Sequence, residues 1–261
     1  DHFPNLKPNT IKDYKRHIRL FREVFFQRKL SSVNPEDAEK FLKSYPSKVQ
    51  ANRMRSTIMC FFEWAIRKKF CGKNPFKEVR KAKENRRTEL VGFDVLKMIL
   101  KQFREQGMKK HHLFFLLIIR TGCRAGEALK MKVEDLTDGV WLKPEENTKN
   151  GKAQRVWVEE EMEGKLKELS NVGLVFGARF TYRAQWEKVR EKCGVPNLRV
   201  HDLRRCVGSE LLSRGANVKA VSSLLGHSDT RITEERYAHY LSDSRSEVKT
   251  IDKILKDIRF G

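Results

Sequence analysis

The stretch that decides the fold reads VWLKPEENTKNGKAQRVWV and runs from Val140 to Val158. Its two ends, Val140–Lys143 and Arg155–Val158, are short runs of β-branched and aromatic residues, which are typical of strands. Asn150-Gly151 between them is a strong signal for a two-residue hairpin turn. The stretch therefore predicts a small antiparallel sheet, with Trp141 and Trp157 packed on it.

Outside this stretch the apolar residues recur at three- and four-residue spacing, which is typical of amphipathic helices. The helices predicted before it cover residues 9–30, 48–70, 95–103, 113–120 and 125–132, with a further short helix starting near Pro35. Those predicted after it cover residues 159–169, 181–193, 200–214, 217–225 and 246–258. The fold class is therefore mostly α with a small antiparallel β-sheet.

The chain of 261 residues is long enough for two domains. We predict a helical bundle over residues 1–78 and a basic linker over 79–90, where large apolar residues are nearly absent. A second domain covers residues 91–261 and ends in a tail helix, 246–258, with apolar residues on one face.

The chain is strongly basic, with 55 Lys and Arg against 34 Asp and Glu, a formal net charge of +21. Residues 1–90 hold 23 basic and 10 acidic residues, so they carry +13 of that charge. This balance favours a polyanionic partner, with nucleic acid as the leading candidate. A generally basic, soluble protein is the alternative, since lysine-rich surfaces also serve solubility.

Several classes of site have no support in the sequence. It contains neither GxxxxGK[ST] nor GxGxxG, and no His/Cys set has metal-ligand spacing. The longest apolar run, Leu113–Ile119, is far too short to span a membrane. The five cysteines are odd in number and form no CxxC pair, which favours reduced thiols in a cytoplasmic protein. We therefore predict no cofactor, no metal and no membrane partner.

Three segments carry residue types suited to phosphate chemistry. TGCRAGE, residues 121–127, places Arg124 at a helix start just after a glycine turn. HDLR places His201 and Arg204 three residues apart, on one face of a helix. The third segment, residues 224–239, contains LLGH and RYAH.

Taken together, these segments resemble the tyrosine recombinase (integrase) family, in the compact form of the Xer recombinases. The family pattern combines TGxRxxE, a hairpin lysine, HxxR, LLGH and a nucleophilic tyrosine in an RYxH-like context. The matching positions, in chain order, are Arg124, Lys149, His201, Arg204, His227 and Tyr237, with Glu127 as a supporting residue. The resemblance covers about 95–242 and implies an N-terminal helical core DNA-binding domain followed by a mixed α/β catalytic domain.

The resemblance implies a site-specific recombinase that cuts and rejoins DNA without metal or ATP. Tyr237 attacks the scissile phosphate and forms a 3′-phosphotyrosyl link, which the 5′ hydroxyl of a partner duplex later reverses. Arg124 and Arg204 suit the charged phosphate because a guanidinium holds two oxygens in a bidentate fork.

The remaining family positions assist that step. His201 is the base for the tyrosine, whose ordinary pKa of about 10 makes it a poor nucleophile. Lys149 gives a proton to the departing 5′ oxygen, and His227 donates a hydrogen bond to the phosphate. Glu127 orients Arg124 or braces its helix.

Alternatives remain at two of these positions. Lys152 lies on the other side of the Asn150-Gly151 turn and competes with Lys149. Tyr240 competes with Tyr237, although the RYxH context favours Tyr237. Ten residues separate His227 from Tyr237 where the family has nine, which leaves open whether cleavage occurs in cis or in trans.

Two rival functions also follow from the sequence. Residues 211–226 read as helix, glycine turn and helix, the spacing of a non-catalytic helix-turn-helix DNA-binding protein. A type IB topoisomerase shares the tyrosine chemistry but relaxes DNA as a monomer. For the recombinase, we expect double-stranded DNA as substrate, a dimer on each site and a tetrameric synapse.

Overall fold

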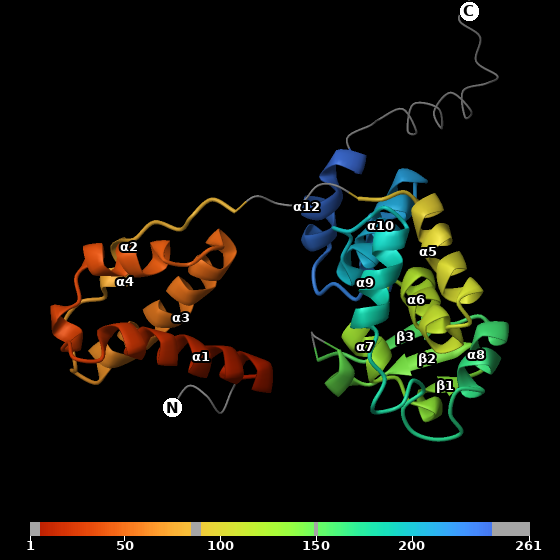
Figure 1. Cartoon of the computed structure of the whole chain (residues 1–261), viewed down its shortest axis with the longest axis horizontal. Coiled ribbons are helices and arrows are strands. Elements are labelled where there is room, and N and C mark those ends of the chain that lie inside the picture. Colours follow the sequence, from red (N-terminus) through yellow and green to blue (C-terminus); the bar gives the residue numbers. More distant parts are fainter. Residues whose placement is uncertain (1–5, 85–89, 149–150, 242–261) are drawn as a thin grey trace, which may run out of the picture. The chain divides into compact units, whose positions relative to one another are not determined.

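The computed structural model describes residues 6–84, 90–148 and 151–241, and only the backbone of residues 236–241. The chain divides into two compact units, residues 1–88 and 89–261, each with its own hydrophobic core. The fold is mostly helical with one small antiparallel sheet, so the predicted fold class is confirmed (Figure 1). No helix within these described ranges is long and apolar enough to cross a membrane.

The first unit is a bundle of four α-helices around an aromatic core. The helices are α1 (Pro8–Phe25), α2 (Pro35–Lys43), α3 (Lys48–Arg67) and α4 (Pro75–Glu78), with a 3₁₀ turn at Leu30–Ser32. Phe21, Phe41, Phe62 and Phe76 meet at the centre with ring centroids 5.7–6.2 Å apart. Each of these rings is at most 5% exposed, so they form the centre of the core of this unit.

Helix α1 ends at Phe25, five residues before the end predicted from the sequence. The guanidinium of Arg28 donates to the backbone oxygen of Ser32 at 2.6 Å and pairs with Asp37 at 2.7 Å. These contacts hold a turn between α1 and α2. The continuous apolar spacing up to Leu30 therefore belongs to a helix followed by a 3₁₀ turn.

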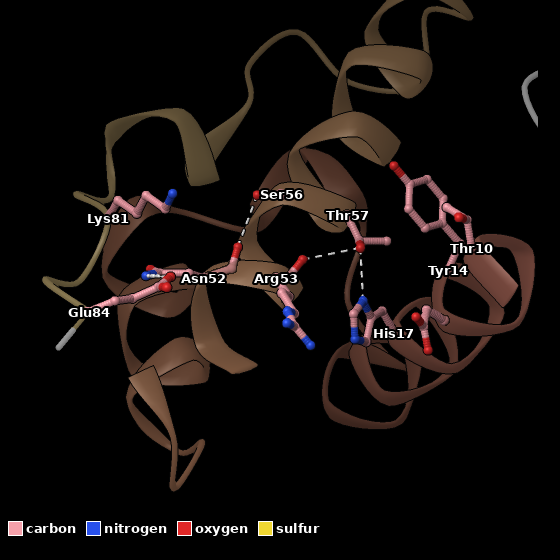
Figure 2. A pocket seen from close by; sticks show the side chains of 10 residues that line it. Thr10, Tyr14, His17, Asn52, Arg53, Ser56, Thr57, Lys81 and Glu84 are labelled. Atoms are coloured by element: carbon pink, nitrogen blue, oxygen red, sulfur yellow. Dashed lines mark hydrogen bonds between the residues drawn. The ribbon is translucent and has the colours of Figure 1, made fainter. Parts of the chain in front are cut away.

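The segment after α4 is attached to α3 by side chains of that helix. Asn52, only 4% exposed, donates to the backbone oxygen of Ala82 (2.8 Å) and to Glu84 Oε1 (2.7 Å), and accepts from the Ala82 N–H (2.9 Å). Arg55 donates to the backbone oxygen of Val79 at 2.7 Å. The basic segment up to Glu84 therefore lies along α3, as the Asn52 contacts in Figure 2 show.

In the second unit the helices and the three-stranded sheet share one hydrophobic core, and the sheet lies at one end of the unit (Figure 1). Before the sheet come α5 (Phe93–Glu105), α6 (Lys109–Thr121) and α7 (Ala125–Leu129). After it come α8 (Glu160–Lys167), α9 (Arg183–Lys192), α10 (Val200–Ser213), α11 (Val218–Leu224) and α12 (Thr230–Leu241). Among these, α12 packs against both α10 and α11. The expected tail helix, 246–258, lies outside the described residues.

The sheet has the strand order β1-β2-β3, all antiparallel. Its strands are β1 (Leu136–Thr137), β2 (Val140–Lys143) and β3 (Gln154–Trp157). In the register Lys143 pairs with Gln154, so residues 144–153 connect β2 to β3. The predicted two-residue turn is therefore wrong, because Pro144 cannot donate to the ladder and a 3₁₀ turn at Glu145–Asn147 follows it.

Strand alternation separates the two tryptophans of the sheet. Trp141 is 1% exposed and belongs to the core, whereas Trp157 is 69% exposed. Successive side chains point to opposite faces of a strand, and Trp157 shares the outer face of β3 with exposed Arg155. Trp157 therefore lies on the outer face of the sheet, near Gly139, and not in the core.

Candidate active site

The guanidinium of Arg204 joins the two turns that precede Arg124 and His227. Arg204 lies in α10 and is 3% exposed. Its Nη1 donates to the backbone oxygen of Gly122 at 2.7 Å, and its Nη2 donates to the backbone oxygen of Leu225. Gly122 lies two residues before Arg124, and Leu225 lies two residues before His227. The structure therefore brings three sequence-predicted site residues into one region of the second unit.

Both turns depend on glycine. Gly122 ends α6 with a φ of +62°, and a Cβ there would lie 2.7 Å from Leu225 Cδ2. Gly226 has a φ of +58°, and a Cβ there would lie 2.9 Å from Gln154 Oε1. A side chain at either position would meet both backbone strain and a neighbour, so glycine allows the two turns to approach closely.

Arg124 is fixed by the carboxylate of Glu127, one turn along α7. Arg124 Nη1 donates to Glu127 Oε1 at 2.5 Å, and the Arg124 backbone N–H donates to Glu127 Oε2 at 3.1 Å. The Arg124 side chain is 28% exposed and that of Glu127 is 5% exposed. Glu127 thus anchors one edge of a guanidinium that still reaches the surface, and a guanidinium has five N–H donors to share between a carboxylate and a phosphate.

A lysine that the motif analysis did not single out lies behind Glu127. Lys143, in β2, is 1% exposed, and its Nζ lies 3.1 Å from Glu127 Oε2 and 3.3 Å from Gln154 Oε1. The same ammonium lies 4.5 Å from the centroid of the Trp141 ring. The available signal was the strand period: Lys143 shares the inner face of β2 with Trp141, so its charge needed a buried partner.

Gln154 continues the contacts from Lys143 toward α11. Its Nε2 donates to the backbone oxygens of Ser223 at 2.8 Å and Leu224 at 3.0 Å. Polar contacts therefore run from Arg124 through Glu127, Lys143 and Gln154 to the end of the helix that precedes His227.

Glu127 is an ionised carboxylate at neutral pH despite its burial. Burial raises its pKa, but the charge of Lys143 and the hydrogen bonds and charge of Arg124 outweigh that effect. The net result is a pKa below the ordinary value. The carboxylate therefore stays charged between two cations, as a fixed anchor for Arg124 requires.

The two histidines occupy different settings. His227 Nδ1 lies 2.7 Å from the hydroxyl of Thr233, which is fully buried, so the ring is oriented by α12. His201 lies in the first turn of α10 and is exposed. Because it precedes Arg204 by three residues, it lies on the same side of α10 as the guanidinium.

The remaining predicted positions are described in part or not at all. Tyr237 and Tyr240 both belong to α12, which packs against α10, the helix of Arg204, and against α11, the helix before His227. The structure describes only the backbone of these two tyrosines. Lys149 also lies outside the described residues. Lys152, its rival, is exposed in the connection between β2 and β3. Among the described residues, no group of three or more His, Cys, Asp or Glu is placed to hold a metal ion.

The first unit offers a basic surface on α1 and an open pocket between α1 and α3. The exposed cations of α1 are Lys12, Lys15, Arg16, Arg19 and Arg22. The pocket, of about 250 Å³, is lined by Tyr14, His17 and Arg53 among others (Figure 2). His17 Nδ1 lies 2.8 Å from Thr57 Oγ1, and burial lowers the His17 pKa although Asp13 opposes this effect. The surface thus combines cations with polar groups that are already ordered.

The chain matches two family models and is similar to curated tyrosine recombinases. Residues 91–243 match the model of the phage integrase family, and residues 4–69 match that of the phage integrase N-terminal SAM-like domain. Tyrosine recombinase XerA of Saccharolobus solfataricus is 28% identical over 257 residues, which cover 91% of this chain and 85% of that relative. Tyrosine recombinase XerD of Staphylococcus epidermidis is 22% identical, over 94% of this chain and 91% of that relative.

Solved structures with the same fold include integrases bound to DNA. A lambda integrase dimer on a COC′ core site superposes with a TM-score of 0.75 at 19% identity, covering 89% of each chain. The Tn1549 transposon integrase with a circular intermediate DNA gives 0.77 at 18% identity, covering 95% of this chain and 96% of that one. Because the phage integrase model spans more than half of the sequence, from Val91 to Asp243, the chain belongs to the phage integrase family, the tyrosine site-specific recombinases.

Proposed function

We propose that this recombinase cuts and rejoins double-stranded DNA through a 3′-phosphotyrosyl intermediate on Tyr237. The observation that carries the proposal is the pair of hydrogen bonds from Arg204 to the backbone oxygens of Gly122 and Leu225. These bonds hold the Arg124 and His227 turns beside α10, the helix against which the tyrosine helix packs. Such a fixed set of cations supplies transition-state charge without a metal ion.

The chemical step is a phosphoryl transfer. The Tyr237 oxygen forms a bond to the scissile phosphorus as the bond from phosphorus to the 5′ oxygen breaks. The tyrosine proton passes to His201, and Lys149 gives a proton to the departing 5′ oxygen. Arg124, Arg204 and His227 hold the nonbridging oxygens. The bond energy is kept in the phosphotyrosyl ester, so attack by a 5′ hydroxyl of a partner duplex reverses the step without ATP.

The assignment of Lys149 and Tyr237 rests on the family pattern, with Lys152 and Tyr240 as the respective alternatives. The first unit, with the exposed cations of α1 and a net charge of +13 over residues 1–90, supplies sequence-independent attraction to the duplex. The five cysteines are free thiols, which favours action in the cytoplasm.

We further propose that two dimers form a tetrameric synapse on DNA. Two observations on solved structures of the same fold support this: one lambda integrase is a dimer on a core site, and another is a tetramer on a Holliday junction. Sedimentation of the protein with duplex DNA measures the assembly directly. A monomer on every duplex would contradict a synapse and favour the topoisomerase alternative.

The experiment that tests the chemistry is covalent trapping. The duplexes that the protein binds are first selected from a random-sequence library, and a nicked duplex is then built around the selected site. After incubation, a denaturing gel reports any protein–DNA adduct. We expect an adduct with the wild type and with Tyr240→Phe, and none with Tyr237→Phe. Loss in Tyr240→Phe with survival in Tyr237→Phe would reassign the nucleophile, and selective binding with no adduct in any variant would favour a non-catalytic DNA-binding protein.

A further inference from the structure

Lys143 is a charged side chain on the buried face of a strand, where apolar side chains are usual. It is 1% exposed, on the inner face of β2 beside Trp141. Taking an ammonium out of water costs free energy that its partners only partly return, and replacing a buried ion pair by apolar residues is often neutral or stabilising. The position of this charge therefore calls for an explanation other than stability.

Its contacts place that charge directly behind the Arg124 anchor. Glu127 uses Oε1 for the Arg124 guanidinium at 2.5 Å and Oε2 for the Lys143 ammonium at 3.1 Å. Oε2 also accepts from the Arg124 backbone N–H at 3.1 Å, so Lys143 is the one hydrogen-bond donor described at this carboxylate that does not belong to Arg124. Without Lys143, the carboxylate loses that contact. The side chain of Glu127 is then held only by the residue that it is meant to hold.

Gln154 extends the same arrangement to the second turn of the site. It accepts from Lys143 through Oε1 and donates through Nε2 to the oxygens of Ser223 and Leu224. The amide lies so close to Gly226 that a Cβ there would meet it at 2.9 Å. Gln154 therefore fixes the position of the turn that leads into His227.

Two separate connections thus join the Arg124 turn to the His227 turn. One is Arg204, through the oxygens of Gly122 and Leu225. The other is the pair Lys143 and Gln154. The second connection adds polar contacts to those of Arg204 and so restricts the relative position of the two turns further.

Resting on the proposed function, we propose that Lys143 and Gln154 are positioning residues for strand cleavage. They hold the Arg124 guanidinium and the His227 turn in one geometry without touching the DNA. Small displacements of groups that hold the reacting phosphate cost about 100-fold in rate.

The test measures adduct formation on the nicked duplex described above, with binding measured separately. Lys143→Met keeps the length of the side chain and removes its charge. We expect a 10- to 100-fold lower first-order rate at saturating duplex, with the Kd for the duplex unchanged. Lys165→Met is the matched control, because Lys165 is an exposed lysine on α8 that forms an ion pair with exposed Glu161. The control should cleave at the wild-type rate.

A double-mutant comparison separates positioning from a general structural effect. If Lys143 acts through Arg124, Lys143→Met should have almost no further effect in an Arg124→Lys background. Independent defects would instead multiply. Gln154→Leu is a second variant for which we expect the same slower cleavage. It replaces Lys143→Met in the experiment if circular dichroism shows that Lys143→Met does not fold.

The outcomes separate this inference from the function on which it rests. If the wild type forms no adduct, the proposed function is wrong. If the wild type forms an adduct and Lys143→Met or Gln154→Leu cleaves at the same rate, the positioning role is overturned. Multiplying defects in the Arg124→Lys background would overturn it as well.

Discussion

Replacing Gly122 by alanine tests whether the close approach of the two turns is required. Gly122 has a φ of +62°, a conformation that costs an alanine about 1–2 kcal/mol. The added Cβ would lie 2.7 Å from Leu225 Cδ2, and Leu225 is 1% exposed, so the Leu225 side chain would have to shift within a buried environment. Overpacking of this kind costs about 1–3 kcal/mol. We therefore expect Gly122→Ala to lower the free energy of unfolding of the second unit by about 2–5 kcal/mol.

Gly126 is the matched control for this substitution, four residues along the chain. It is exposed in α7, its φ is negative, and a Cβ there would have no heavy atom within 4 Å. Alanine in a helix is favoured over glycine by about 0.5–1 kcal/mol. The same substitution should therefore stabilise the protein at Gly126 and destabilise it at Gly122.

Urea denaturation of the full chain measures both changes. Circular dichroism follows the helices, and tryptophan fluorescence reports the second unit through Trp141 and Trp186, which are 1% and 4% exposed. The midpoint should fall in Gly122→Ala and rise slightly in Gly126→Ala, with similar slopes. A wild-type midpoint in Gly122→Ala would refute the close approach of Gly122 to Leu225. The two turns that Arg204 joins would then not require a glycine at this position.

Three further changes test other contacts. Asn52→Ala removes three hydrogen bonds to the segment after α4, so it should cost the first unit about 2–3 kcal/mol, and hydrogen exchange of Ala82 should accelerate. Thr233→Val removes the hydroxyl beside His227 Nδ1 but keeps the shape, so adduct formation should slow while the Kd for DNA holds. An unchanged rate would show that the Thr233 hydroxyl is not needed to orient His227. Burial raises the pKa of Glu163, but the hydrogen bonds from Lys167 and from the Gly139 N–H, together with the charge of Lys167, lower it by more. The net pKa is therefore below the ordinary value. The stability that Glu163 contributes is present above its unfolded pKa of about 4.3 and is lost as pH falls through the lower folded value. In urea titrations at several pH values, Glu163→Gln should therefore lose less stability toward acid than the wild type. Equal acid sensitivity of the two proteins would contradict this contribution of Glu163.

Elements whose ends are fixed by local chemistry were predicted well from the sequence. Helix α11 begins after Asn217, whose side chain accepts from the Lys219 and Ala220 N–H groups, and α6 ends at Gly122. Both signals act within a few residues, so they need no tertiary information.

Elements that depend on pairing were predicted less accurately. Strand β1, Leu136–Thr137, has only two residues and no pattern of its own, so only its pairing with β2 defines it. The connection after β2 was misjudged because Pro144 takes the chain out of the ladder well before the Asn-Gly signal. In both cases the deciding contact lies on another segment.

The candidate site divides in the same way. The positions to which we assign the reaction stand in short motifs, and the resemblance to the family singled them out. Lys143 and Gln154 stand in no motif, and their partners lie 16 and about 70 residues away in the chain. Their place is set by the strand period and by burial, so sequence motifs alone did not find them.

Arg204 shows why fold and chemistry are inseparable in this site. The sequence presents it as one cation of a pair for the phosphate, yet it is 3% exposed and donates to two backbone oxygens. A buried guanidinium is stable there only because those carbonyls and the surrounding contacts compensate for its lost hydration. Two of its donors hold the Gly122 and Leu225 turns, and the proposed function assigns the same guanidinium to the phosphate. Lysine, with a single point charge, cannot span both turns, which is a physical reason for arginine at this position.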